Sequence, residues 1–155
     1  MFKFTKAAIF ALAALIGLGS AAVQAGSAEN GYDKQKVVYH LNDVNHATAA
    51  FRNIKNHLNA VGDKNVEIIV VAHSSGAFAL VDGAMGKKDK NGKVYNFTDQ
   101  IAGLANRGVK FEICANTIKG KHIDKAKINE NAEIVPSGVA QVAQLQQQGY
   151  AYVKP

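Results

Sequence analysis

The chain has 155 residues and a formal net charge of +6, from 18 lysines and arginines against 12 aspartates and glutamates. This length is typical of one domain and leaves no room for two full-sized ones. The charge is mild and is spread over many short stretches, so it gives no reason to expect nucleic acid as a partner. Because Cys114 is the single cysteine, a disulfide within the chain is excluded.

The first 25 residues have the pattern of a secretory signal peptide. Lys3 and Lys6 precede an uncharged, apolar run over 7–18, and small residues follow as far as Ala25. We expect cleavage after Ala25, with cleavage after Ala28 as the alternative. The apolar run is shorter than the roughly 20 residues that a transmembrane helix needs.

The signal peptide therefore predicts export to the periplasm, with no stable membrane span once it is removed. The mature chain, Gly26–Pro155, then forms a single α/β domain and carries 16 basic against 12 acidic residues.

The first half of the mature chain alternates strand and helix patterns. Lys36–Leu41 is a short β-rich run, and from His46 to Val61 the apolar residues fall three and four positions apart, as on one face of a helix. The next strand, Val66–Ala72, is almost continuously apolar, as expected of a parallel strand covered on both faces.

The middle of the chain predicts two more helices around a loop. One helix begins near Ala77 and extends to Met85, the lysine-rich segment 86–96 is a loop, and helical spacing returns from Phe97 to Asn106. Thr98 is the expected N-cap of this last helix.

The last part of the chain again alternates. Val109–Cys114 is the third strand, and the polar stretch Ala115–His122 is the loop in which we expect an active site. Ala132–Pro136 is the fourth strand, helical spacing runs from Val139 to Leu145, and Tyr150–Val153 closes the sheet as the fifth strand.

This alternation predicts an α/β fold, a parallel sheet of about five strands with helices on both faces. In such sheets ligands bind at the carboxyl ends of the strands. Polar side chains follow three of the predicted strands there, and these are the candidate site residues: His40, Asn42, His73, Ser74, Cys114, Asn116 and Thr117.

Three segments resemble the DsrE-like group of sulfur-relay proteins: Val71–Gly76, Gly108–Thr117 and Val135–Val139. The likeness covers about the whole mature chain. It implies a five-stranded α/β fold, assembly into homo- or hetero-oligomers, and, in the catalytic members, a cysteine that carries sulfur as a persulfide. Cys114 stands at the position of that cysteine. Characterised relays act in the cytoplasm, so the export signal and the lysine-rich segment depart from the family pattern.

The resemblance implies that Cys114 is a sulfur carrier or sulfurtransferase residue. A thiol becomes a better sulfur acceptor where cations or a helix N-terminus stabilise its anion, and Lys119, Lys121 and His122 follow closely in sequence. With no second cysteine, the sulfur would pass to another protein, a small thiol or sulfite. The alternative is a buried cysteine that packs as a small hydrophobe, in a non-catalytic binding or assembly module of the same fold.

The other candidate residues also have structural readings. His73 and His40 are either ligands or acid–base groups, or histidines packed at strand ends, and Ser74 is either part of an anion-binding turn or a plain N-cap.

Other classes of site have little support in the sequence. Histidine-based metal binding is a weaker alternative, because none of the five histidines has the short spacing of a structural zinc site. The Gly-x-Ser-x-Gly, Gly-x-Gly-x-x-Gly and Walker motifs are absent, so neither a nucleophilic hydrolase nor a nucleotide cofactor is expected.

Overall fold

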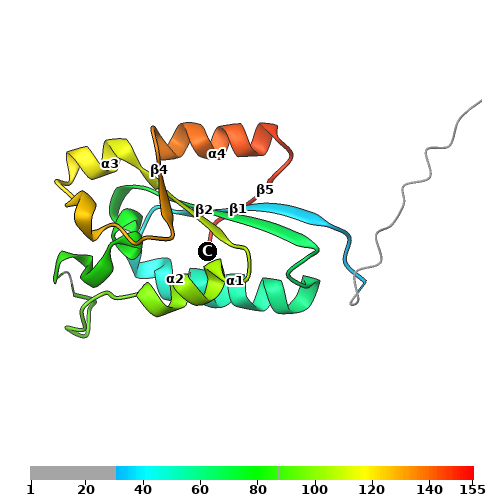
Figure 1. Ribbon diagram of the computed structural model, residues 1–155, viewed down its shortest axis with the longest axis horizontal. Coiled ribbons are helices and arrows are strands. Elements are labelled where there is room, and N and C mark those ends of the chain that lie inside the picture. The colour runs from blue at the N-terminus through cyan, green and yellow to red at the C-terminus, as the bar shows by residue number, and fades with distance from the viewer. Residues whose placement is uncertain (1–30, 87) are drawn as a thin grey trace, which may run out of the picture.

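The computed structural model describes residues 31–86 and 88–155, so the predicted signal peptide lies outside the described residues. Five parallel strands form one sheet in the order β4-β3-β2-β1-β5 (Figure 1). All five predicted strands are confirmed, within one residue at each end. They are β1 (Gln35–Leu41), β2 (Val66–Ala72), β3 (Lys110–Cys114), β4 (Ala132–Val135) and β5 (Ala151–Val153).

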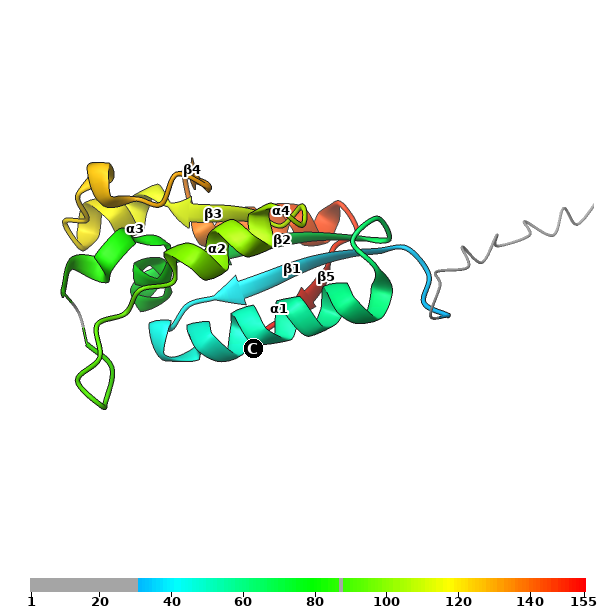
Figure 2. The same ribbon diagram turned by 60° about the horizontal axis from the view of Figure 1, so that its bottom comes forward.

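Helices cover both faces of the sheet, as the sequence predicts. The helices α1 (Ala47–Val61) and α2 (Thr98–Ala105) lie on one face, and α4 (Gly138–Gln147) lies on the other (Figure 1, Figure 2). The larger core lies between the sheet and the α1/α2 layer. The smaller core, beneath α4, consists of Val38, Ile69, Val71, Val142, Leu145 and Tyr150.

The segment after β2 differs from the prediction of a single helix from Ala77 to Met85. It forms two 3₁₀ helices, Ser74–Leu80 and Asp82–Gly86. Between them, Val81 is extended and makes an antiparallel bridge to Ile128, which uses the backbone that a continuous α-helix needs. Gly83 also has a φ of +65°, outside the right-handed helical region.

The segment after β3 also differs, since the predicted active-site loop contains the short helix α3 (Ala115–Gly120). Cys114 is its N-cap residue and Ile118 is buried against the core. The buried Ile118 packs this helical turn against the core directly after the strand end. The N–H groups of this turn are consequently aimed back toward Cys114.

The described residues 88–96 of the lysine-rich segment form a loop, as predicted, and this loop is closed by an antiparallel bridge between Lys88 and Val94. Thr98 is the first residue of α2 rather than its N-cap, which is Phe97. The Thr98 hydroxyl instead donates to Asp82 Oδ1 at 2.7 Å and so connects α2 to the second 3₁₀ helix.

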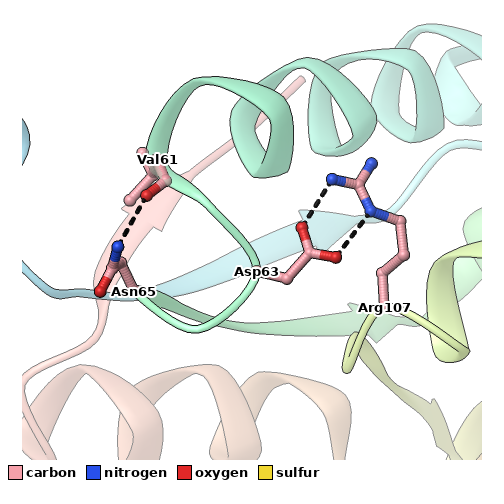
Figure 3. Close-up of polar contacts among 4 residues, drawn as sticks. All are labelled: Val61, Asp63, Asn65 and Arg107. Carbon is pink, nitrogen blue, oxygen red and sulfur yellow. Dashed lines mark hydrogen bonds and ion pairs between the residues drawn. The ribbon is translucent and has the colours of Figure 1, made fainter. Parts of the chain in front are cut away.

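An ion pair joins two turns on the side of the sheet opposite the carboxyl ends. Arg107, after α2, donates from Nε and from one terminal nitrogen to Asp63, after α1, at 3.0 and 2.6 Å (Figure 3). Nearby, the Asn65 side chain donates to the Val61 carbonyl at 3.2 Å. Both charged side chains are partly exposed, so this pair contributes at most about 1 kcal/mol. It connects the turn after α1 to the turn after α2.

The chain runs outward from β1 to β4 and then returns through α4 to place β5 on the far side of β1. This return brings the N-terminus of α4 over the carboxyl ends of the central strands. Within residues 31–86 and 88–155, no helix combines the length and the apolar character that crossing a membrane requires.

Candidate functional site

Four polar side chains form a row across the sheet, at its carboxyl edge and on the α4 face. Side chains alternate between faces along a strand, and Val38 and Val71 belong to the core beneath α4. Tyr152 pairs with Val38, and His40 pairs with Val71, so both lie on this face. His73 lies two residues after Val71 and so is on the same face. Glu112 pairs with Val71, and Cys114, two residues after Glu112, is also on this face. The row is Tyr152, His40, His73 and Cys114.

The Cys114 thiol is enclosed, with only 5% of the residue exposed. Burial by itself raises the pKa of the thiol. Hydrogen bonds outweigh it: the N–H groups of Gly138, Thr117 and Asn116 and the Thr117 hydroxyl point at the sulfur and leave its pKa below that of a free cysteine. Dipoles of the backbone therefore stabilise the thiolate.

These donors come from the first turns of two helices. Thr117 and Asn116 are in α3, directly after Cys114, while Gly138 is the first residue of α4. Ser137 caps α4 and accepts a hydrogen bond from the Ala140 N–H at 3.4 Å. The positive ends of both helices thus face one sulfur atom, an arrangement that favours an anion.

Gly138 holds Cys114 and His73 close together. A Cβ atom placed on Gly138 would lie 3.0 Å from His73 Cβ and 3.3 Å from Cys114 Cβ. Both separations are tighter than ordinary van der Waals contact, so a side chain at this position would require the neighbouring atoms to shift by a few tenths of an ångström.

The turn after β2 is fixed to the same site through Ser74. The Ser74 N–H donates to Thr117 Oγ1 at 3.1 Å, and Ser74 itself has a φ of +52°, a conformation uncommon for residues other than glycine. With its oxygen accepting from Ser74, the Thr117 hydroxyl is oriented to donate its proton toward Cys114.

The two candidate histidines are in direct contact. Nε2 of His40 lies 2.5 Å from Nε2 of His73, and His40 Nδ1 lies 2.6 Å from the Tyr152 hydroxyl. Burial lowers the pKa of His73. Burial also lowers the pKa of His40, with further contributions from the positive charges of His73 and Lys154. Both histidines therefore stay neutral to lower pH than a free histidine.

The structure brings together most of the residues that the sequence singled out. Cys114, His73 and His40 share one row, and Thr117 and Ser74 adjoin it. Asn116 contributes its backbone N–H. Asn42 lies elsewhere in the same edge, where its carbonyl accepts from the Ser75 hydroxyl at 3.4 Å.

The sequence left two ways of stabilising the Cys114 thiolate open, nearby cations or a helix N-terminus, and the structure has backbone N–H groups at the sulfur. Lys119, Lys121 and His122 are exposed at and beyond the C-terminal end of α3, whereas the donors to the sulfur occupy its first turn. A helical turn directs its amide protons toward its N-terminus and carries the later side chains away.

The sequence analysis missed two members of the site, Gly138 and Tyr152. Tyr152 could be found only from the pairing of β5 with β1, in which it lies opposite Val38, two residues before His40.

In the described residues, no three histidine, cysteine, aspartate or glutamate side chains gather in a way that holds a metal ion.

Comparison with known proteins agrees with the fold. Protein MTH1491 of unknown function from Methanobacterium thermoautotrophicum superposes with a TM-score of 0.66 and 26% identity, covering 79% of this chain and 100% of its own. The ychN protein from E. coli has a TM-score of 0.58 and 16% identity, covering 79% of this chain and 99% of its own, and so shows the fold alone. A search of curated proteins gave no match. The model of the DsrE/DsrF-like family matches residues 35–155, the region that forms the sheet, its helices and the Cys114 site, and the chain belongs to that family.

Proposed function

We propose that this protein is an exported sulfur carrier, in which Cys114 holds sulfane sulfur as a persulfide. The observation that carries the proposal is the enclosure of the thiol by N–H donors from two helices, which lowers its pKa. A thiolate is the form that attacks sulfur. Family membership supports the same reading, because the family is commonly associated with sulfur relay.

The loading step moves a sulfur atom from the sulfite group of thiosulfate to the Cys114 thiolate. The Cys114 thiolate attacks the outer sulfur of thiosulfate, a new S–S bond forms on Cys114, the S–S bond of thiosulfate breaks and sulfite leaves with the electron pair. No external oxidant or reductant is required. The same N–H donors that stabilise the thiolate are placed to stabilise the anionic persulfide.

The small exposed fraction of Cys114 restricts the donor. With 5% of the residue exposed, the sulfur is accessible to a small anion such as thiosulfate or polysulfide before it is accessible to a bulky group. The predicted signal peptide, 1–25, supports a periplasmic location for this chemistry, and the DsrE-like domain of the proposal is the remainder, 26–155.

The test is persulfide labelling after incubation with thiosulfate or polysulfide. We expect the wild-type protein to label at one sulfur per chain and Cys114→Ser to label at background, because serine cannot form the S–S bond. Mass spectrometry of the intact chain measures the added sulfur. Equal labelling of the two proteins would overturn the carrier function.

A non-catalytic binding or assembly module of the same fold is the second candidate, and the burial of Cys114 favours it. Such a module buries its cysteine as a small hydrophobe. Two exposed apolar side chains near the site, Ile134 and Val139, are 48% and 66% exposed and support self-association into a homo-oligomer. Light scattering on wild type and Val139→Ser measures this: we expect an oligomer that the serine weakens, and a monomer in both would contradict it.

A further inference from the structure

The hydrogen-bonded row of Tyr152, His40 and His73 joins the solvent to the side of Cys114. At its outer end, Tyr152 is 42% exposed. At its inner end, His73 lies against Gly138, and Cys114 is also next to Gly138. Two bonds of 2.6 and 2.5 Å connect the three side chains. A continuous path of exchangeable protons therefore runs from the protein surface to His73, which lies beside Gly138 next to the Cys114 site.

Such a path moves a proton without moving a heavy atom. With His73 donating from Nε2 to His40, and His40 donating from Nδ1 to the Tyr152 oxygen, the second nitrogen of His73 is free to accept a proton. When it does, His73 passes its Nε2 proton to His40, His40 passes its Nδ1 proton to Tyr152, and Tyr152 releases its own proton to water. The proton from the site has then been exchanged for one in the solvent.

The loading of Cys114 by thiosulfate has no use for this path, because a thiolate attacks and a sulfite anion leaves. Delivery of sulfur to a thiol does have a use for it. An ordinary thiol has a pKa of about 8.5, so near neutral pH it arrives carrying a proton that must be removed before its sulfur can attack.

We propose that the Tyr152–His40–His73 row is the base that deprotonates a thiol acceptor, and that the carrier therefore delivers its sulfur to thiols. The inference rests on the proposed carrier function of Cys114. The acceptor R–SH gives its proton to His73, and its thiolate attacks the outer sulfur of the Cys114 persulfide. The persulfide S–S bond breaks, the persulfide anion R–S–S⁻ forms, and Cys114 leaves as a thiolate with the electron pair. The sulfur changes carriers without net oxidation or reduction.

The surroundings keep this base neutral. Tyr152 and Lys154 face it from β5 and its extension, and Cys114 and Glu112 from β3, while α4 contributes no titratable side chain. Burial lowers the pKa of both histidines, so they are unprotonated throughout the neutral range. General base catalysis typically contributes about 10²–10⁴-fold, and for a row open to water at one end we expect the lower part of that range.

The experiment loads Cys114 with sulfur and compares two acceptors at pH 8. One is 2-mercaptoethanol, which must lose a proton, and the other is sulfite, which at this pH has little proton to lose. The measured quantity is the ratio of the two transfer rates. We expect His73→Gln and His40→Gln to lower this ratio by about 100-fold, and Tyr152→Phe to lower it less, because it interrupts only the outer step.

His57 provides a matched control on the opposite face of the sheet. It is half-buried and bonds to a tyrosine in the same way, with Nδ1 3.1 Å from the Tyr39 hydroxyl and Nε2 2.6 Å from Gln35 Oε1. His57→Gln should keep the wild-type ratio. Thermal melting shows whether each variant is folded. If one histidine variant is unfolded, the other histidine variant or Tyr152→Phe takes its place in the comparison.

The outcomes separate the two proposals. If wild-type Cys114 takes up no sulfur, the carrier function fails. If it takes up sulfur and the ratio in folded His40→Gln and His73→Gln equals that of wild type, the base is overturned and the carrier function stands. A fall in the ratio of the same size in His57→Gln would also overturn the proposal, because the effect would not belong to this row.

Discussion

Gly76→Ala is expected to destabilise the protein by about 3 kcal/mol or more, at the upper end of what overpacking costs. Gly76 is buried in the 3₁₀ helix after β2, and a Cβ atom there would lie 2.1 Å from the Leu41 carbonyl oxygen and 2.6 Å from its carbon. These are backbone atoms at the end of β1, so no side-chain rotation relieves the overlap. Either the turn or the strand end must move.

The measurement is thermal or urea unfolding of the two proteins. For a domain of this size the expected loss corresponds to a fall in Tm of about 10 °C or more. The turn that moves carries His73, and the strand end that moves carries His40, so the contact between the two histidines should be lost as well.

Gly103→Ala is the matched control for this prediction. Gly103 lies in α2, where a Cβ atom would have nothing within 4 Å. Alanine favours a helix over glycine by about 0.5–1 kcal/mol, so this variant should be slightly more stable than wild type. A Gly76→Ala protein as stable as wild type would show that the turn does not pack on β1 as described.

The reactivity of the Cys114 thiol is the second prediction, and Thr117→Val should lower it by about ten-fold near neutral pH. The Thr117 hydroxyl is one of the donors that lower the pKa of the thiol. Hydrogen bonds to charged groups contribute about 1.5–3 kcal/mol, so its loss shifts the balance toward the unreactive protonated form. The measurement is the rate of alkylation by a small neutral reagent across pH.

Thr117→Ser retains the hydroxyl and should react like wild type, which separates loss of the hydrogen bond from loss of packing. The wild-type rate should rise with pH around a midpoint below that of the denatured chain. A folded protein that does not react at all would favour the buried core cysteine of the binding-module alternative, and a midpoint equal to that of the denatured chain would contradict the activation of the thiolate.

The same pKa shift makes stability depend on pH, with a definite sign. The folded-state pKa of Cys114 is lower than that of the unfolded chain, so the unfolded state holds the proton to higher pH. The stabilisation is therefore fully present above the unfolded pKa, near 8.5, and is lost as pH falls through the folded pKa. Relative to Cys114→Ser, the wild type should gain stability between neutral pH and pH 9.

The strands and the main helices could be predicted from the sequence because their signals are local. The apolar run of Val66–Ala72 and the three-and-four spacing from Ala47 to Val61 each describe one element and its buried face. Where a segment depends on distant contacts the prediction was wrong: the bridge from Val81 to Ile128 interrupts the helix expected between Ala77 and Met85.

The candidate site also has one part that could be predicted from local sequence and one part that depends on distant contacts. Cys114, His73 and His40 were identifiable because each stands at the end of a predicted strand, and parallel strands end at one edge of a sheet. The sequence by itself therefore determined the α/β class, the strands and the edge where the site lies.

Only the tertiary structure decided which side chains and backbone groups contact one another at that edge. The return of the chain from β4 to β5 places Gly138 against Cys114 and His73 and brings Tyr152 to His40, contacts between residues up to 112 positions apart in sequence. No local pattern encodes such a contact, because it arises from strand order and register. Those two features bring the Gly138 N–H to the sulfur, whereas the donors from Asn116 and Thr117 follow locally from α3.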